Sequence, residues 1–140
     1  MAETTALIVG LVMPALHIIR LLAEDIKKII DAPKIIQDLR DKLDAVHASV
    51  ECLKDITEEQ WAALGQKVSD QSKATIEACI NTCRDLNGRI RIWTKSQNGQ
   101  LSWRRKTVIG LFKEHRIKSE ADQLLSCKAS LDATVNMATL

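Results

Sequence analysis

The chain has no tyrosine, one phenylalanine, five glycines and two prolines among its 140 residues. Sheets favour aromatic residues, and the turns between strands need glycine and proline. These shortages exclude a sheet as the main architecture. The apolar fraction of 46% and the charged fraction of 27% are ordinary for a soluble globular protein. The length is that of one domain that can bury a real core.

Motifs for nucleotide binding and for catalysis are also missing. The sequence contains no P-loop, no G-x-G-x-x-G and no G-x-S-x-G. His17, His47 and His115 stand in an apolar, an amphipathic and a basic stretch, and none has a catalytic partner at suitable spacing. The four cysteines form no C-x-x-C pair, so we expect reduced, mostly buried thiols. The sequence therefore predicts no enzyme, no cofactor, no metal and no small-molecule substrate.

What the chain does have is a strongly apolar start. Residues 6–16 (ALIVGLVMPAL) carry no polar side chain, and the apolar pattern resumes after His17 and again after Arg20. A helix that is apolar nearly all round is either fully buried or in contact with lipid. From Ala6 to Ala23 it reaches the short edge of the roughly 20 residues that span a bilayer. It lacks the basic start and the cleavage site of a signal peptide. We expect a helix that could sit in a soluble core or leave it for a membrane. The candidate membrane-insertion residues are Leu7, Ile8, Val9, Gly10, Leu11, Val12 and Leu16.

Breaks in the pattern divide the first half of the chain into two helices. The first is expected over residues 5–30, with Pro14 either kinking it or marking a late start. Asp31 suits a helix cap, and Pro33 is tolerated in the first turn of a second helix that runs to about Lys54.

The second half holds the remaining helices. Thr57, followed three residues later by glutamine, forms a capping box that starts a third helix, with a break near Gly65. Residues 96–102 (SQNGQLS) are the clearest loop. A short basic helix is expected over residues 103–112, and Ser119 can cap the last helix. Short connections of this kind favour antiparallel neighbours.

Together these segments predict an all-α bundle of four to five mostly antiparallel helices, a single domain over residues 1–140 with a hydrophobic N-terminal helix. Apolar residues recur at threes and fours on successive segments, which predicts one shared core. The expected core residues are Leu7, Leu11, Ile18, Leu22, Ile36, Leu39, Leu43, Ile76, Leu86, Leu124 and Leu131.

Bases are concentrated late in the chain. Residues 1–56 hold seven bases and nine acids, whereas residues 84–118 hold ten bases and two acids. The basic stretch is either a solvated face or a contact for an anionic surface. Anionic lipid is more economical than nucleic acid, because bases worth roughly 1 kcal/mol each near such a surface would cooperate with an insertable helix. The candidate contacts for anionic lipid are Arg89, Arg91, Arg104, Arg105 and Lys106.

Three stretches of the chain carry a family resemblance. The apolar first helix with Gly10 is followed by DAPKIIQDLRDKLDAVHASVECLKDI (residues 31–56), an acid-small-proline turn and then leucines spaced along a helix. WRRKTVIGLFKEHRIKSEADQLLSCKASL (residues 103–131) closes with a Q-L-x-x-C-K-x-x-L pattern. In this order and spacing, over nearly the whole chain, they resemble the HeLo-like N-terminal domain of fungal STAND (NLR-type) proteins. Pro14 departs from the first helix of that family.

The resemblance implies a helical bundle that acts in fungal programmed cell death and heterokaryon incompatibility. It implies a domain that rests in the cytoplasm, oligomerises, exposes its N-terminal helix and permeabilises the plasma membrane, as in the related HeLo and necroptosis four-helix executioner domains. It also implies activation by a C-terminal nucleotide-binding or amyloid-motif region, or by a partner receptor. The chain is then an excised domain or a stand-alone form.

The residues themselves leave other functions open. The chain could be a non-lytic protein–protein interaction or regulatory module of a STAND receptor, in which residues 7–22 stay in the core. Nucleic-acid binding through the basic stretch is a weaker hypothesis, and steep salt dependence without a lipid requirement would favour it. We expect membrane lipids and further copies of the chain as partners, and no nucleic acid.

Overall fold

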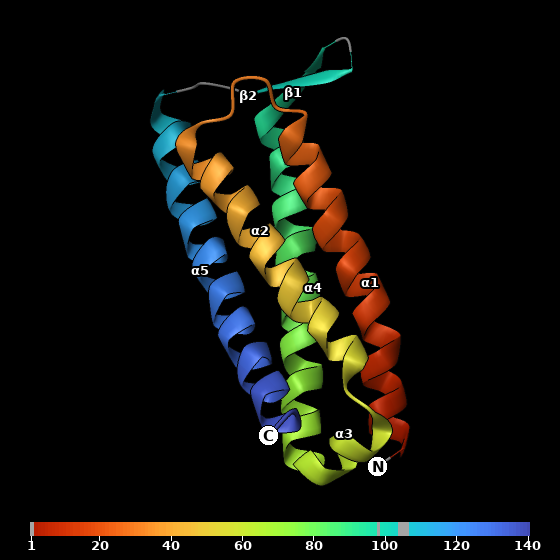
Figure 1. The fold of residues 1–140 in the computed structure, drawn as a ribbon. Coiled ribbons are helices and arrows are strands. Elements are labelled where there is room, and N and C mark those ends of the chain that lie inside the picture. The colour runs from red at the N-terminus through yellow and green to blue at the C-terminus, as the bar shows by residue number, and fades with distance from the viewer. Residues whose placement is uncertain (1, 98, 104–106) are drawn as a thin grey trace.

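The computed structural model describes residues 2–97, 99–103 and 107–140, and the side chains of residues 6–96, 99–103 and 114–140. It is an all-α bundle with an apolar N-terminal helix, which confirms the predicted fold class, and a small hairpin lies at one end (Figure 1). The elements in chain order are α1 (Ala2–Lys27), α2 (Lys34–Cys52), the 3-10 turn η1 (Leu53–Asp55), α3 (Glu58–Leu64), α4 (Gln66–Trp93), β1 (Thr94–Gln97), β2 (Gln100–Trp103) and α5 (Thr107–Ala138).

Four long helices lie side by side, and the short helix α3 crosses the end of the bundle opposite the hairpin (Figure 1). Long helices that are consecutive in the chain run antiparallel. The most extensive packing is between α1 and α4 and between α2 and α5, and within each of these pairs the helices run in the same direction. This arrangement arises because α3 carries the chain across the end of the bundle from α2 to the start of α4.

The predicted capping box at the start of α3 is confirmed. The Thr57 hydroxyl accepts a hydrogen bond from the backbone N–H of Gln60 at 3.1 Å, and the Thr57 backbone N–H donates to the Gln60 side-chain oxygen at 2.8 Å. Gly65 separates α3 from α4 with a φ of 93°, a conformation that favours glycine. The predicted break at this residue is therefore also confirmed.

Helix α1 begins earlier than expected and passes through Pro14. It starts at Ala2 and ends at Lys27, so the late start at Pro14 was wrong, as was the end at residue 30. Pro14 has no N–H to donate to the Gly10 carbonyl one turn earlier. Both residues are exposed, and no atom lies within 4 Å of the Cβ position of Gly10. Water can therefore satisfy the carbonyl that Pro14 leaves without a donor.

Asp31 does not cap α2. The N-cap residue is Pro33, without a side-chain hydrogen bond. The Asp31 carboxylate instead accepts hydrogen bonds from the Trp103 backbone N–H at 2.8 Å and from the Ser102 hydroxyl at 3.4 Å. The acid thus fixes the hairpin to the connection between α1 and α2.

Ser96 and Gln97 lie in one strand and residues 100–102 in the other strand of a hairpin, which corrects the expected loop. Strands β1 and β2 pair antiparallel, with Thr94 opposite Trp103. On the other side of β2, the Leu101 backbone N–H donates to the Lys28 carbonyl and the Leu101 carbonyl accepts from the Ile30 N–H, both at 3.0 Å. The hairpin is therefore held by a segment about 70 residues away in the sequence, which no local signal could indicate.

Helix α5 is continuous where two helices were expected. It runs from Thr107 to Ala138 through Ser119, so neither the separate helix over residues 103–112 nor the cap at Ser119 is present. Ile117, Ala121 and Leu124 are buried at successive spacings of four and three. This periodicity keeps one face of α5 in the core on both sides of Ser119.

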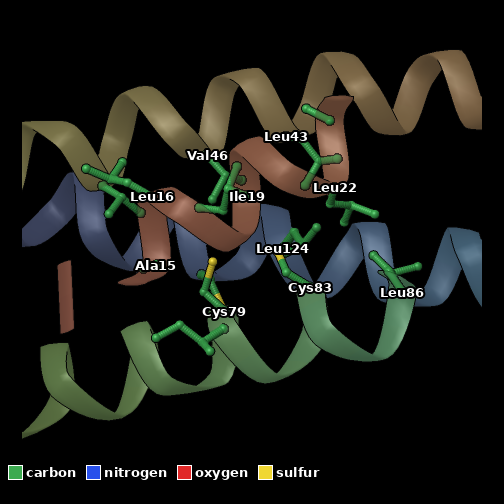
Figure 2. Packing of buried hydrophobic residues seen from close by; sticks show 14 of the residues in the cluster. Ala15, Leu16, Ile19, Leu22, Leu43, Val46, Cys79, Cys83, Leu86 and Leu124 are labelled. Carbon is green, nitrogen blue, oxygen red and sulfur yellow. The ribbon is translucent and has the colours of Figure 1, made fainter. Parts of the chain in front are cut away.

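The core runs through the centre of the four long helices. Figure 2 shows Leu16, Ile19 and Leu22 of α1 facing residues of α2, α4 and α5. Eight of the expected core residues are fully buried: Leu22, Ile36, Leu39, Leu43, Ile76, Leu86, Leu124 and Leu131. Leu11 and Ile18 are only partly buried, and Leu7 is 53% exposed, which makes its assignment to the core wrong. The face of α1 that packs inward is instead centred on Ile8, Val12 and Leu16.

All four cysteines are free thiols, as expected. Cys79, Cys83 and Cys127 are buried, whereas Cys52 at the end of α2 is exposed. Burial raises the pKa of the Cys127 thiol, so this sulfur stays protonated and packs as a small apolar group.

Candidate membrane-active segment and basic surface

The start of α1 has two apolar faces. One face is buried, with Ile8, Val12 and Leu16 at most 3% exposed. Leu7 and Val9 on the other face are 53% and 58% exposed, Gly10 is also exposed, and Leu11 is partly buried. The seven candidate insertion residues are therefore divided between the core and the surface. Sequence reasoning missed a further member of the exposed face, Met13, which is 60% exposed.

The stretch Ala6–Lys27 is the one described helix long and apolar enough to cross a membrane, judged by length and composition alone. The core helix of a soluble protein can satisfy the same criterion. In this bundle, however, only 39% of the most apolar window is buried. The rest of the window is partly buried or exposed, so α1 presents apolar side chains to its outer side as well as to the core.

Among the described side chains of α1, polar contacts begin near its C-terminal end. From Ala6 to Glu24, no side chain forms a hydrogen bond or ion pair with another described residue. Asp25 is the first to do so, accepting a hydrogen bond from the Asn87 amide at 3.0 Å. The backbone bonds of Lys28 and Ile30 with β2 follow. The side chains of residues 6–24 are thus held to the described bundle by apolar packing, which is non-directional.

Helix α5 is attached differently, by polar contacts along its length. The Ser49 hydroxyl of α2 donates to Asp132 at 2.7 Å, and the Ser72 hydroxyl of α4 lies 3.1 Å from that of Thr134. Near the end of the helix, the Gln60 amide of α3 donates to the Ala138 carbonyl at 3.1 Å. These directional bonds fix the register of α5, whereas nothing comparable fixes the first half of α1.

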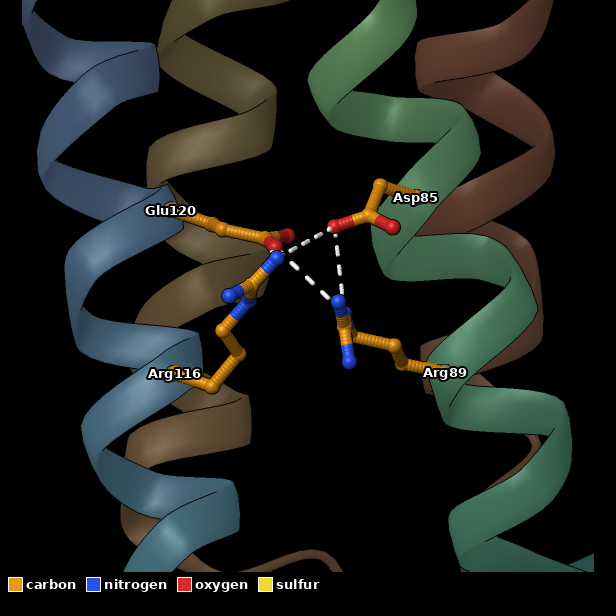
Figure 3. Close-up of polar contacts among 4 residues, drawn as sticks. All are labelled: Asp85, Arg89, Arg116 and Glu120. Atoms are coloured by element: carbon orange, nitrogen blue, oxygen red, sulfur yellow. Dashed lines mark hydrogen bonds and ion pairs between the residues drawn. The ribbon is translucent and has the colours of Figure 1, made fainter.

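The candidate basic residues differ in their surroundings. Arg89 of α4 forms ion pairs with Asp85 at 3.1 Å and with Glu120 of α5 at 3.5 Å (Figure 3). Arg91 is exposed and forms no ion pair within the described part of the chain. Arg104, Arg105 and Lys106 lie outside the described residues. Among the described candidates, Arg91 is therefore the one with an exposed charge that no described acid pairs with, which makes it available to an anionic surface.

The ion-pair cluster between α4 and α5 contains a perturbed acid that sequence reasoning missed. The Glu120 side chain is 8% exposed, and its Oε1 accepts from Arg116 Nε at 2.9 Å while its Oε2 is buried without a partner. Burial, and then the hydrogen bond shared with Asp85, raise the pKa of Glu120 to about 7. That same bond, together with the bond from Arg89, lowers the pKa of Asp85 to about 2. The proton shared by the two acids therefore resides on Glu120.

Leu7 and Arg91, one described residue from each predicted membrane determinant, lie near opposite ends of the bundle. The parallel helices α1 and α4 both end at the hairpin (Figure 1), and Arg91 lines a groove together with Asp25 and Lys28 at the end of α1. Leu7 is twenty residues before Lys27, which at 1.5 Å per residue is about 30 Å. When the resting bundle stands end-on to a flat membrane, Leu7 and Arg91 therefore cannot both contact that membrane.

The two late tryptophans serve as core anchors at the hairpin. The Trp93 and Trp103 rings pack edge to face with centroids 6.1 Å apart, and Trp103 is 8% exposed.

No group of three or more histidine, cysteine or acidic side chains within the described residues could hold a metal ion. No family model, no curated protein and no solved structure matches the chain in the comparisons with known proteins.

Proposed function

We propose that this chain is a membrane-permeabilising effector domain of fungal programmed cell death, in heterokaryon incompatibility or NLR-type immune signalling. The observation that carries the proposal is the first half of α1, where an apolar helix is half exposed and the side chains of residues 6–24 form no polar contact with another described residue. The resemblance to HeLo-like domains supplies the biological setting. The domain rests in the cytoplasm and reaches the plasma membrane on activation.

Energetics indicate why activation is needed. Six large side chains of α1 are at most 3% exposed: Ile8, Val12, Leu16, Ile19, Leu22 and Ile26. Burial of such side chains contributes about 1.5–3 kcal/mol each. Exposing all six to water would cost on the order of 10 kcal/mol, comparable to the whole stability of a domain of about 5–15 kcal/mol. The helix therefore leaves the bundle only when lipid or other copies of the chain cover the apolar surface.

This cost is consistent with oligomerisation as part of the mechanism. Self-association can cover the core face that α1 vacates, while lipid covers α1 itself. The trigger is a C-terminal nucleotide-binding or amyloid-motif region, or a partner receptor, as the family resemblance implies. No nucleic acid and no small-molecule substrate enter this mechanism.

The second candidate is a non-lytic interaction or regulatory module of a STAND receptor. It is favoured by the exposed apolar side chains of Leu7, Val9 and Met13, which are distributed around the outer side of α1, because helical partners dock on apolar helix surfaces. In this function α1 stays in the core and only its outer face is covered.

Dye leakage from liposomes separates the two functions. We expect Leu7→Lys to leave thermal melting nearly unchanged, because the side chain is 53% exposed, and to abolish leakage, because a charge near the start of α1 must enter lipid. Leu125→Lys, at a 36% exposed position on α5, is the matched control and should leak like the parent. Full leakage by Leu7→Lys would exclude insertion of α1 and favour the interaction module.

A further inference from the structure

We propose that the resting bundle docks end-on to an anionic bilayer through its hairpin end, the surface formed by residues 25–34, 91–96 and 99–103. In this arrangement Ile30 and Ile92 enter the headgroup region, and the exposed bases at the same end of the bundle contact lipid phosphates. The proposal rests on the proposed membrane function and adds a first contact that precedes any movement of α1.

Charge distinguishes the two ends of the molecule. The hairpin end carries five exposed bases: Lys27, Lys28, Lys34, Arg91 and Lys95. Its acids are Asp25 and Asp31. The opposite end, which contains α3, carries the exposed acids Asp55, Glu58 and Glu59 beside the exposed bases Lys54 and Lys67, so acids outnumber bases there. An anionic surface therefore attracts the hairpin end and orients the bundle.

The acids at the hairpin end are engaged within the protein. Asp25 accepts a hydrogen bond from Asn87 and lies 4.0 Å from the ammonium of Lys28. Asp31 accepts hydrogen bonds from the backbone and hydroxyl groups of β2. Lys28 and Arg91 also border a shallow groove of about 310 Å³ between the ends of α1 and α4. Two cations, Lys28 in the turn after α1 and Arg91 in the last turn of α4, thus border one groove together with the carboxylate of Asp25.

Two large apolar side chains project among these bases. Ile30 is 65% exposed and Ile92 is 71% exposed, more than any other described isoleucine. Exposed isoleucines amid exposed bases match a bilayer interface, where apolar groups meet acyl chains and cations meet phosphates. Nucleic acid would use the charges but would leave the isoleucines in water.

The backbone around both isoleucines is rigid. The Ile30 N–H donates to the Leu101 carbonyl at 3.0 Å, and Ile92 lies in the last helical turn of α4 beside Trp93. The Trp93 ring packs on Trp103, which is held by Asp31. Docking therefore costs little conformational entropy, because the backbone that carries Ile30 and Ile92 is already ordered.

Vesicle flotation tests the proposal with the intact chain. Vesicles of phosphatidylcholine alone are compared with vesicles of phosphatidylcholine mixed with phosphatidylserine. We expect binding to the mixed vesicles, and a loss of about tenfold or more for Lys28→Glu with Arg91→Glu. We expect a loss of about tenfold for Ile30→Ser with Ile92→Ser. Met137→Ser, at a 45% exposed position near the opposite end, is the matched control and should bind like the parent.

The outcomes are decisive in both directions. Unchanged binding of either double variant overturns end-on docking, and so does an equal loss for Met137→Ser. A loss for the charge variant without a loss for the isoleucine variant would indicate a purely electrostatic contact, as nucleic acid makes, and would overturn insertion of the isoleucines. Leakage is measured separately with Leu7→Lys, so failure of docking and failure of the proposed function are distinguishable.

An environment-sensitive dye provides a readout that does not depend on loss of binding. Cys52 is the one exposed cysteine in the described chain and lies at the end of α2 remote from the hairpin. With Ile92→Cys in a Cys52→Ser background, the dye should shift to shorter wavelength on phosphatidylserine-containing vesicles. The dye on Cys52 in the parent chain should not shift before leakage begins. An equal shift at both positions would exclude end-on docking.

Discussion

The carboxyl of Glu120 combines deep burial with charged neighbours on two helices. Its Oε1 faces Arg116 and Arg89, whereas its Oε2 is buried without a donor. In the ionised state, part of the negative charge lies on an oxygen that nothing solvates. This arrangement explains in structural terms why the pKa of Glu120 rises to about 7 and why Asp85, which keeps its charge, has a pKa of about 2.

The pH dependence of stability follows from these two values. The folded pKa of Glu120 lies above its usual value of 4.5, so its contribution is full below pH 4.5 and is lost as the pH rises to about 7. Asp85 is ionised in the folded and unfolded states over this interval and adds no slope. We expect the free energy of unfolding to fall by about 1–3 kcal/mol between these pH values.

Replacement of the acid isolates its contribution. In Glu120→Gln the decline between pH 4.5 and 7 should largely disappear, as measured by denaturant unfolding at a series of pH values. Asp122→Asn, which removes an exposed acid from the same helix, is the control and should keep the decline. A parent protein equally stable at both ends of the interval would contradict the assignment of the proton to Glu120.

At the scale of the elements, the connection between α1 and α2 depends on Asp31. Its carboxylate accepts the Trp103 N–H at 2.8 Å and joins the hairpin to the end of α1. Asp31→Ala should lower the free energy of unfolding by about 1.5–3 kcal/mol, the range for a hydrogen bond to a charged group. The tryptophan emission should also shift to longer wavelength, because Trp103 loses its anchor.

The matched control for this variant is Asp38→Ala. Asp38 is an exposed acid on α2. Its replacement should change stability by less than about 0.5 kcal/mol. Equal stability of the Asp31 and Asp38 variants would mean that the hairpin is held by its apolar contacts alone.

Local signals predicted the elements that local interactions form. The capping box at Thr57 and the break at Gly65 depend on residues within one turn of each other, so the sequence displays them directly. The hairpin was missed because the backbone of β2 is hydrogen-bonded to the Lys28–Ile30 segment, about 70 residues earlier in the sequence. The continuity of α5 through Ser119 was missed because a serine suits a cap and an exposed helical position equally well.

The candidate site was predictable in its chemistry and only partly in its geometry. An all-apolar stretch indicates a helix that is buried or in contact with lipid. It does not indicate which face packs inward, because apolar residues occur on every side of the helix. Leu7 and Ile8 are equivalent by composition, and their exposed fractions are 53% and 1%. The pair of Asp85 and Glu120 was invisible for a different reason, since thirty-five residues of sequence separate them.

At the scale of the whole molecule, the attachment of the helices is uneven. Directional hydrogen bonds and ion pairs hold α5 from Glu120 to Ala138, whereas among the described side chains of α1 polar contacts begin at Asp25. A bundle built in this way has one helix whose N-terminal end can separate while its C-terminal end stays attached to the hairpin. Under the proposed function, docking at the hairpin end would therefore hold the pivot of α1 at the membrane.

The spacing of charge along α1 limits how far its free end can travel. Between Glu3 and His17 lie thirteen residues without an ionisable side chain, which as a helix measure about 20 Å. The hydrocarbon core is about 30 Å thick. With His17 and Arg20 at the headgroups, an inserted α1 would therefore fill one leaflet and stop as a wedge, and the Glu3 carboxyl would enter the hydrocarbon in its neutral, protonated form. A probe at Ala2 should be quenched by lipids labelled near the bilayer midplane, whereas quenching by a water-soluble agent on the far side would contradict the wedge. Crowding one leaflet in this way strains the membrane without an ordered channel.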